Sequence, residues 1–276
     1  MTILDGKKIA QDLMEELRVK VERSSKKPKL AIIRVGADGA TDSFLKIKKQ
    51  TGEKIGIEVR IFAFADDITT NNLRKRIADI VNENKNTAVI IQLPLPGHIN
   101  TQYILNSVTP DKDADMLSAR ALGNFITGKS LIFPPVAGAV KKILDKYNIE
   151  YRSKNILIVG AGRLVGRGVF LWLSKEDVGF SVVTKNTADL SSYVRNADIL
   201  ISGAGHPHLI TGDMIKEGAV VIDAGLSELN GKTVGDVDFE SASSKASYIT
   251  PIPGGVGPLV VAMLFNNVVI LQEQEK

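Results

Sequence analysis

The sequence predicts a protein of the α/β class with two domains, on three observations. The chain has 276 residues, just under twice the length of about 150 residues that is common for one domain. Short apolar runs alternate with segments of helical periodicity, which indicates parallel sheets covered by helices on both faces. Midway along the chain, an apolar run leads directly into a glycine-rich turn, the pattern of a nucleotide-binding α/β domain.

The first set of alternating elements opens with Ile9, Leu13, Leu17 and Val21, whose spacing of four predicts one face of an amphipathic helix. Further helices are expected over residues 40–55 and 71–84. The strands expected between them cover residues 30–35, 57–64 and 87–93. These elements predict one α/β domain.

A break follows at residues 108–131, which hold an acidic cluster and two glycines. A helix is expected to open at Pro134-Pro135 and to run through Leu144. Beyond it, strands are expected over residues 155–159, 180–184, 198–202, 219–223 and 248–250, with a last apolar helix over residues 259–271. The second set predicts a second α/β domain, and we expect a cleft between the two.

The composition excludes several kinds of site and partner for this protein. The absence of cysteine excludes disulfides, thiolate metal sites and cysteine nucleophiles. A net charge of +4, with no zinc finger or RNA-binding aromatic motif, predicts no nucleic-acid partner. The three histidines have no metal-like spacing, so no metal is expected. The N-terminal segment lacks a long apolar core and the apolar run 256–271 is interrupted by two asparagines, so we expect a cytoplasmic protein without a membrane partner.

The glycine-rich turn follows the strand expected at 155–159 and reads Gly160-Ala-Gly162-Arg-Leu-Val-Gly166. In a Rossmann domain the first glycine permits the tight bend, and the second lets backbone N–H groups approach a pyrophosphate at the positive end of a helix. The spacing is one residue longer than the usual fingerprint, so a plain tight turn is the alternative. The cofactor-binding candidates here are Gly160, Gly162, Arg163, Val165 and Gly166, with Gly203 from the turn after residues 198–202.

The tip of the following strand indicates which dinucleotide is bound. An acidic residue there would hold a ribose 2′-hydroxyl, but the tip reads Thr184-Lys185-Asn186. A lysine suits a 2′-phosphate, so Lys185, with Arg163 near the turn, predicts NADP, while NAD stays possible. Each cation could instead be an ordinary solvated surface charge.

Several segments together resemble one family along almost the whole chain. They are Gln92-Leu-Pro-Leu-Pro96, Pro110-Asp-Lys-Asp-Ala-Asp115, Gly218-Ala-Val-Val-Ile-Asp-Ala-Gly225, Val234-Gly-Asp-Val237 and, as the most specific, Pro251-Ile-Pro-Gly-Gly-Val-Gly-Pro258. This set is similar to the bifunctional methylenetetrahydrofolate dehydrogenase/methenyltetrahydrofolate cyclohydrolases. The resemblance implies a folate-binding catalytic domain over residues 1–118, completed by 257–276, and a Rossmann domain over 119–256. It also implies a last helix that packs back on the first domain, and a homodimer formed through the Rossmann domains.

The resemblance carries roles onto particular residues. Lys48 matches the catalytic lysine, Gln92 the glutamine that holds it, and Asp115 the aspartate that pairs with the pterin edge. Phe44 stands one helical turn before Lys48, where the family has tyrosine, and Gly257 and Pro258 match the segment close to the pterin. Without the family, Lys48 would be interpreted as a solvated helix lysine, Gln92 and Asp115 as loop residues and Phe44 as core.

The chain departs from the family pattern at several positions that would contact folate or cofactor. Besides Phe44, these are Met116 for a glycine, Val136 for a threonine, Ala161-Gly162 for Arg-Ser, Thr184-Lys185 for His-Ser, and Leu259-Val260 for Met-Thr.

The sequence therefore predicts oxidation of 5,10-methylenetetrahydrofolate to the methenyl form with NADP, and hydrolysis of that product to 10-formyltetrahydrofolate. Two alternatives stay open. One is a degenerate relative that binds folate or nucleotide with little or no hydrolysis, and the other is a different two-domain dehydrogenase, such as one acting on shikimate.

Overall fold

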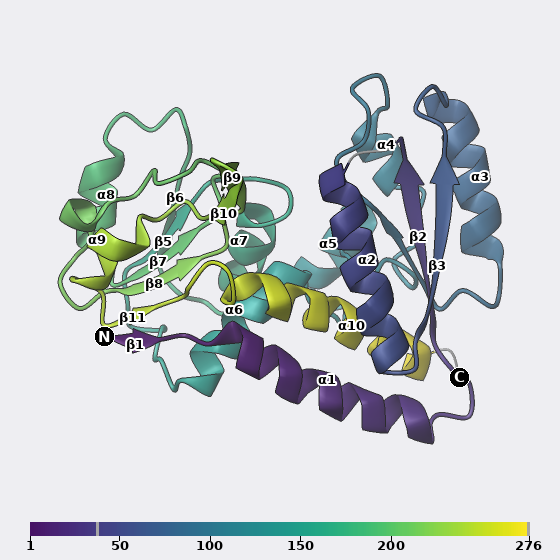
Figure 1. Ribbon diagram of the computed structural model, residues 1–276, viewed down its shortest axis with the longest axis horizontal. Coiled ribbons are helices and arrows are strands. Elements are labelled where there is room, and N and C mark those ends of the chain that lie inside the picture. The colour runs from purple at the N-terminus through teal and green to yellow at the C-terminus, as the bar shows by residue number, and fades with distance from the viewer. Residues whose placement is uncertain (37–38, 275–276) are drawn as a thin grey trace. The chain divides into compact units, whose positions relative to one another are not determined.

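A computed structural model describes residues 1–36 and 39–274 (Figure 1). Residues 37–38 and 275–276 lie outside the described residues. The chain divides into two compact units. We call residues 1–11 with 134–263 the six-stranded unit, and residues 12–133 with 264–276 the three-stranded unit.

The three-stranded unit contains a parallel sheet in the order β3-β2-β4, which are Glu58–Phe64, Lys29–Val35 and Ala88–Ile91. An isolated parallel bridge between Val89 and Asp113 extends the sheet beyond β4. Its helices are α2 (Gly39–Lys54), α3 (Thr70–Asn82), α4 (Thr101–Leu105) and α5 (Ala119–Ile126). Figure 1 shows α2 and α3 on opposite sides of β2 and β3.

Side chains alternate between the two faces of β2, so both faces can be buried. Ala31, Ile33 and Val35 pack in one core with Leu73 and Ile77 of α3. Leu30 and Ile32 of the same strand are also fully buried. This burial on both faces explains why residues 30–33 of β2 are all apolar.

The six-stranded unit contains one parallel sheet in the order β6-β5-β7-β8-β11-β1. The strands are β1 (Thr2–Ile3), β5 (Ile156–Val159), β6 (Phe180–Val183), β7 (Ile199–Ser202), β8 (Val220–Asp223) and β11 (Tyr248–Ile249). The chain leaves β5 toward β6 on one side and later returns to β7 on the other, so the strand order reverses between β5 and β7. That reversal is where α/β sheets of this kind bind dinucleotides.

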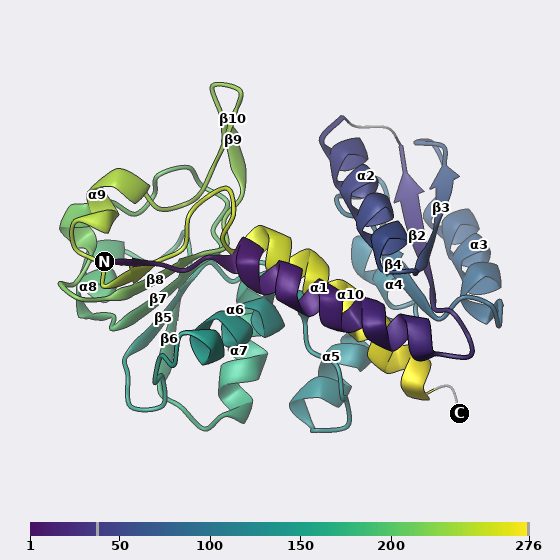
Figure 2. The ribbon, with the colours of Figure 1, turned by 60° about the horizontal axis from the view of Figure 1, so that its bottom comes forward.

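The helices of the six-stranded unit are α6 (Pro135–Lys146), α7 (Gly166–Lys175), α8 (Leu190–Asn196) and α9 (Phe239–Ser243), with a short 3₁₀ helix at Gly212–Met214. A hairpin of β9 (Ser227–Leu229) and β10 (Lys232–Val234) projects from this unit (Figure 2). Its turn is Asn230-Gly231, both at positive φ, as a two-residue hairpin turn requires.

Two long helices contribute to both units: α1 (Gly6–Arg23) and α10 (Val256–Gln274). By length and composition alone, α10 could cross a membrane. In the structure its apolar side chains are largely core residues, since Leu259, Phe265 and Val268 are fully buried. Asn267, also buried, donates through Nδ2 to the carbonyls of Ala114 and Phe133 at 2.8 and 2.7 Å.

The predicted α/β class and all eight expected strands are confirmed, each to within two residues at its ends. The division of the chain differs from the expected one, which had boundaries after residues 118 and 256. Residues 1–11 group with the six-stranded unit because β1 pairs with β11 there. Residues 119–133 stay with the three-stranded unit, where Phe133 contacts the ring of Phe125 and binds Asn267.

Candidate active site

The first cluster of functional side chains lies in the three-stranded unit. Lys48 is on α2 and Gln92 directly follows β4, and the lysine Nζ donates to the glutamine Oε1 at 2.8 Å. Gln92 Nε2 donates to the carbonyl of Leu93 at 2.8 Å, which turns the amide so that its oxygen faces the lysine. The glutamine is therefore oriented to hold the ammonium or amine of Lys48 in one place.

Asp115 completes this cluster electrostatically. Burial lowers the pKa of Lys48, and the negative charge of Asp115 opposes that shift. Burial also raises the pKa of Asp115, opposed by the charge of Lys48. The cluster thus biases both groups toward their neutral forms, so Lys48 can release a proton more readily than a solvated lysine.

The loop that carries Asp115 is anchored by Asp113. The carboxylate of Asp113 is 3% exposed and accepts hydrogen bonds from the backbone N–H groups of Leu117 and Ser118, at 3.1 and 2.8 Å. Burial raises the pKa of Asp113 to about 6, and the charge of Asp115 adds to that shift. Met116, where the family has glycine, lies in this loop at φ 56°, a conformation that side chains with a Cβ rarely adopt.

Phe44 lies one turn before Lys48 on α2 and is 42% exposed. An exposed aromatic ring beside a polar cluster can stack on a flat ligand. Its position is therefore compatible with ligand contact, and it is not a core residue.

The dinucleotide turn has the tight geometry that the sequence predicted. Gly160 has φ 95°, and a Cβ on it would lie 2.7 Å from the carbonyl oxygen of Gly203. A Cβ on Gly203 would overlap Val165, and one on Gly166 would overlap the carbonyl of Gly160. These four residues interlock, so the turns after β5 and β7 form one packed surface.

Gly162 differs from the other glycines of the turn, because a Cβ there would meet nothing closer than 3.8 Å. The protein itself therefore does not require glycine at this position, and the open space suits the approach of a ligand. Val165 provides no side-chain cap to α7, and among the first N–H groups of this helix that of Arg167 donates to the carbonyl of Gly162 at 3.0 Å. The N-terminus of a helix is a favourable place for an anion. These features fit a dinucleotide pyrophosphate.

The two predicted cations differ in their surroundings. Lys185 is exposed just beyond β6. Arg163 is half-buried, and its Nη1 is buried without a hydrogen-bond partner among the described residues. Gly257 and Pro258 lie in the first turn of α10, in the six-stranded unit. The structure thus brings Lys48, Gln92 and Asp115 together in one unit and the cofactor candidates together in the other.

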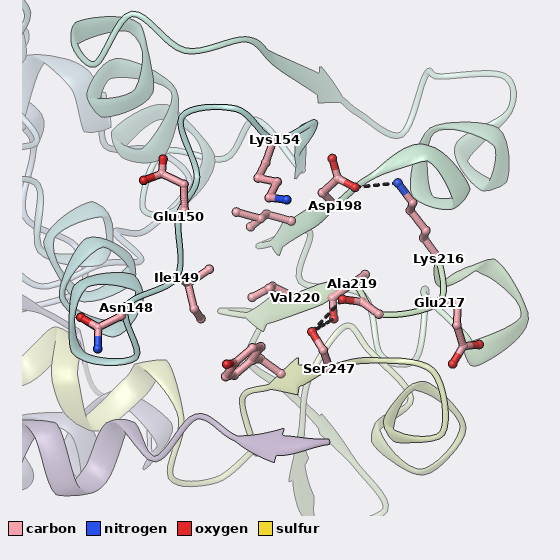
Figure 3. Close-up of a pocket in the computed structure, with 13 residues that line it drawn as sticks. Asn148, Ile149, Glu150, Lys154, Asp198, Lys216, Glu217, Ala219, Val220 and Ser247 are labelled. Atoms are coloured by element: carbon pink, nitrogen blue, oxygen red, sulfur yellow. Dashed lines mark hydrogen bonds and ion pairs between the residues drawn. The ribbon is translucent and has the colours of Figure 1, made fainter.

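A cavity of about 310 Å³ lies at the opposite edge of the six-stranded sheet, at the amino ends of β7, β8 and β11 (Figure 3). Lys216 closes part of its wall by pairing with Asp198 at 2.6 Å. Dinucleotides bind at the carboxyl ends of such strands, so this cavity is not the cofactor site.

Sequence reasoning did not single out three buried carboxylates near these sites, Asp113, Asp223 and Asp236. All three stand inside segments that resemble the family. Asp223 stands within an otherwise apolar run and Asp236 beside a glycine, and a carboxylate in such a place is rare unless backbone donors bind it. Asp113 stands in an acidic segment and has no such signal.

Comparison with known proteins identifies the family. Residues 4–115 match the catalytic domain of tetrahydrofolate dehydrogenase/cyclohydrolase, and residues 134–276 match the NAD(P)-binding domain of the same family. A fold of two α/β units with a nucleotide turn and a lysine–glutamine–aspartate cluster is typical of a cofactor-dependent enzyme. The chain belongs to the tetrahydrofolate dehydrogenase/cyclohydrolase family.

Individual relatives match this chain over nearly their full lengths. The bifunctional protein FolD of Hydrogenobaculum sp. is 41% identical over 269 residues, which cover 97% of both chains. The crystal structure of the bifunctional FolD from Campylobacter jejuni superposes with a TM-score of 0.96 at 37% identity, covering 100% of both chains. The Trypanosoma brucei enzyme, solved with NADP cofactor and inhibitor, gives a TM-score of 0.93 at 31% identity, covering 99% of this chain and 98% of that one.

The raised pKa of Asp113 predicts a dependence of stability on pH. Between its ordinary pKa of 3.8 and about 6, Asp113 is protonated in the folded chain but ionised in the unfolded one. The unfolded state binds fewer protons there, so its contribution to the free energy of unfolding falls as pH rises through this window. In urea unfolding, the stability of wild type relative to Asp113→Asn should decrease by about 2 kcal/mol from pH 4 to pH 7, at about 1.4 kcal/mol per pKa unit, because part of the change lies below pH 4.

The matched control is Asp111→Asn, an exposed carboxylate two residues away. The difference in free energy of unfolding between Asp111→Asn and wild type should change far less over the same pH range. If the difference in free energy of unfolding between wild type and Asp113→Asn stays constant with pH, the raised pKa of Asp113 is contradicted.

Proposed function

We propose that this chain oxidises 5,10-methylenetetrahydrofolate to 5,10-methenyltetrahydrofolate with NADP and hydrolyses the product to 10-formyltetrahydrofolate. The observation that carries the proposal is the 2.8 Å hydrogen bond between Lys48 and Gln92, beside Asp115, in a chain whose other unit holds an intact dinucleotide turn. Retention of this cluster favours an enzyme over a relative that only binds.

In the oxidation, the chain binds and orients the reactants. NADP, when bound, accepts the hydride, and no strong base is needed for that transfer. The packed turns at Gly160 and Gly203, with the start of α7, hold the dinucleotide. Asp115 binds the N–H donors of the pterin, an interaction strengthened by its charge.

In the hydrolysis, water attacks the methenyl carbon and protons must move. Lys48 is the group suited to this, because burial lowers its pKa, so Nζ releases a proton more readily than the amine of a solvated lysine. Gln92 keeps Nζ in place through the bond from Lys48 and contributes no titratable group. Phe44 supplies an aromatic face without the phenol of the family's tyrosine.

The choice of NADP rests on the cations near the nucleotide site. Lys185 occupies the strand tip where an acidic residue would repel a 2′-phosphate, and the buried Nη1 of Arg163 has no hydrogen-bond partner in the part of the chain that the structure describes. The Trypanosoma brucei relative was solved with NADP.

We also propose that the protein is a cytoplasmic homodimer assembled through its six-stranded units. Support comes from exposed apolar side chains on and beside the edge strand β6: Val182 of β6 is 36% exposed, and Phe170 of α7, 43% exposed, packs edge-on against Phe180 of β6. Apolar groups of this kind on an edge strand suit a contact with a second copy.

The proposal is tested with purified protein, 5,10-methylenetetrahydrofolate and NADP, following reduced cofactor and methenyl product separately. Both activities are expected in wild type. Asp115→Ala should weaken folate binding at least tenfold, because each charge-assisted hydrogen bond contributes roughly 1.5–3 kcal/mol before solvent is considered. Unchanged folate affinity would remove Asp115 from the site, and absence of both activities in wild type would favour the non-catalytic relative.

Cofactor preference is tested by Lys185→Glu. The new carboxylate should repel the 2′-phosphate and reverse or abolish a preference for NADP over NAD, measured as the ratio of kcat/KM for the two cofactors. Lys175→Glu, a lysine on α7, is the charge-matched control and should leave the ratio unchanged. Equal use of both cofactors by wild type would contradict the assignment.

The missing phenol is tested by Phe44→Tyr. A hydroxyl one turn from Lys48 should help set the proton state of the lysine, so methenyl hydrolysis should rise severalfold while oxidation stays nearly constant. Lys48→Met should abolish hydrolysis. Flat hydrolysis in Phe44→Tyr would contradict the role given to the missing phenol, as would a wild type that hydrolyses methenyl folate faster than it oxidises methylene folate.

A further inference from the structure

The six-stranded unit buries two carboxylates that the reaction described above does not use. Asp223 ends β8 and is 3% exposed, and Asp236 lies between β10 and α9 with no exposed surface. A buried carboxylate is costly unless several donors bind it. The donors that face each group therefore show what it does.

The donors to Asp236 all come from the end of β7 and the loop that follows. Its Oδ2 accepts from Ser202 Oγ at 2.7 Å and from the backbone N–H of Ala204 at 2.6 Å, and its Oδ1 accepts from the backbone N–H of His206 at 2.9 Å. One carboxylate thus binds alternate residues along one short segment. It holds the backbone of residues 202–206 in a single shape.

Asp223 in turn fixes the segment that carries Asp236. Its Oδ2 accepts from the backbone N–H of Val237 at 2.8 Å, and its Oδ1 accepts from that of Gly225 at 2.9 Å. Burial, together with repulsion from Asp236, raises the pKa of Asp223 to about 6. The two carboxylates repel each other, and Asp223 nevertheless holds the segment next to Asp236 through its bond from Val237.

The backbone packs tightly against the carboxylates of Asp223 and Asp236. A Cβ on Gly225 would lie 2.3 Å from Oδ1 of Asp236, and one on Gly235 would lie 2.0 Å from Oδ2 of Asp223. Both carboxylates are therefore held by contact as well as by hydrogen bonds.

The loop that Asp236 holds is one wall of the dinucleotide site. The N–H of Gly203 donates to the carbonyl of Val159 at 2.9 Å, and the Gly203 carbonyl packs against Gly160, the first residue of the nucleotide turn. The loops after β5 and β7 flank the point where the strand order reverses. A shift of residues 203–206 would change the surface on which the cofactor lies.

We propose that Asp236 is a positioning residue for the cofactor, and that its carboxylate holds residues 202–206 against the Gly160 turn in the shape that NADP binding requires. The proposal rests on the function proposed above for its choice of cofactor. An amide cannot replace the carboxylate, because its NH₂ group would face an N–H donor and leave that donor unpaired.

A positioning role of this kind makes a selective prediction. Hydrolysis uses Lys48, Gln92 and Asp115, which lie in the three-stranded unit, and consumes no cofactor. Disturbing residues 202–206 should therefore impair hydride transfer and NADP binding, but not hydrolysis. A residue that only stabilised the fold would lower both activities together.

The experiment measures three quantities in Asp236→Asn: the Kd of NADP by calorimetric titration, the KM of NADP in the oxidation, and the rate of methenyl hydrolysis. The Kd and KM of NADP should rise at least tenfold, with hydrolysis and the KM of folate within twofold of wild type. Ser202→Ala removes one donor and leaves both backbone donors, so it should raise the Kd two- to threefold. Should Asp236→Asn fail to fold, Ser202→Ala decides the test on its own.

The matched control is Asp238→Asn. Asp238 lies two residues further along and binds Ser241 Oγ at 2.8 Å, away from residues 202–206. It should leave the Kd of NADP unchanged. An unchanged Kd in Asp236→Asn, or in Ser202→Ala where it must serve alone, would overturn the proposal, as would a parallel loss of both activities. Failure of the proposed function is distinguishable, because the titration of NADP needs no turnover.

Discussion

The parallel pairing of strands is the constraint on which both sites depend. In a parallel sheet all strands end at the same edge, so the residues that follow them converge there. Gln92 follows β4, Gly160 follows β5 and Gly203 follows β7, each at the carboxyl end of its strand. Crossover helices then return the chain to the opposite edge, and one of them, α2, places Lys48 against Gln92.

A second feature of the molecule is a set of ionisable side chains whose pKa values are shifted by burial. Lys48, Asp113, Asp115 and Asp223 all have pKa values displaced toward the neutral form, with burial as the largest cause in each case. Two of these groups form the candidate proton-transfer and pterin-binding site. The other two anchor loops through backbone N–H donors, so the same unfavourable burial serves chemistry in one pair and precise positioning in the other.

Several residues that depart from the family pattern lie near the Lys48–Gln92 hydrogen bond or in the nucleotide turn, and both features are present. Phe44 lacks a hydroxyl and Met116 occupies a left-handed backbone position, yet the Lys48–Gln92 bond is made. At the nucleotide turn, Ala161-Gly162 replaces Arg-Ser, while the interlocked glycines of the turn remain. The structure therefore combines these departures with an intact Lys48–Gln92 hydrogen bond and a tightly packed nucleotide turn.

The sequence alone determined the class, the alternating elements and the nucleotide turn, because apolar periodicity and glycine spacing are local properties. The dipeptide Asn230-Gly231 is likewise a local signal, typical of a two-residue hairpin turn. Short elements such as α4, α5 and α9 lack a periodic pattern long enough to detect, so they were not foreseen.

Resemblance to a family named Lys48, Gln92 and Asp115, but nothing local to any of them distinguishes a buried, hydrogen-bonded lysine from a solvated one. Tertiary structure decided that point, because Lys48 and Gln92 are 44 residues apart and meet only once α2 packs beside β4. It also decided the role of Asp236, whose donors lie 30 to 34 residues earlier in the chain. Burial and hydrogen bonding across such distances are properties of the packed fold, which is why the sequence could name Lys48, Gln92 and Asp115 without showing what they touch, and did not name Asp236.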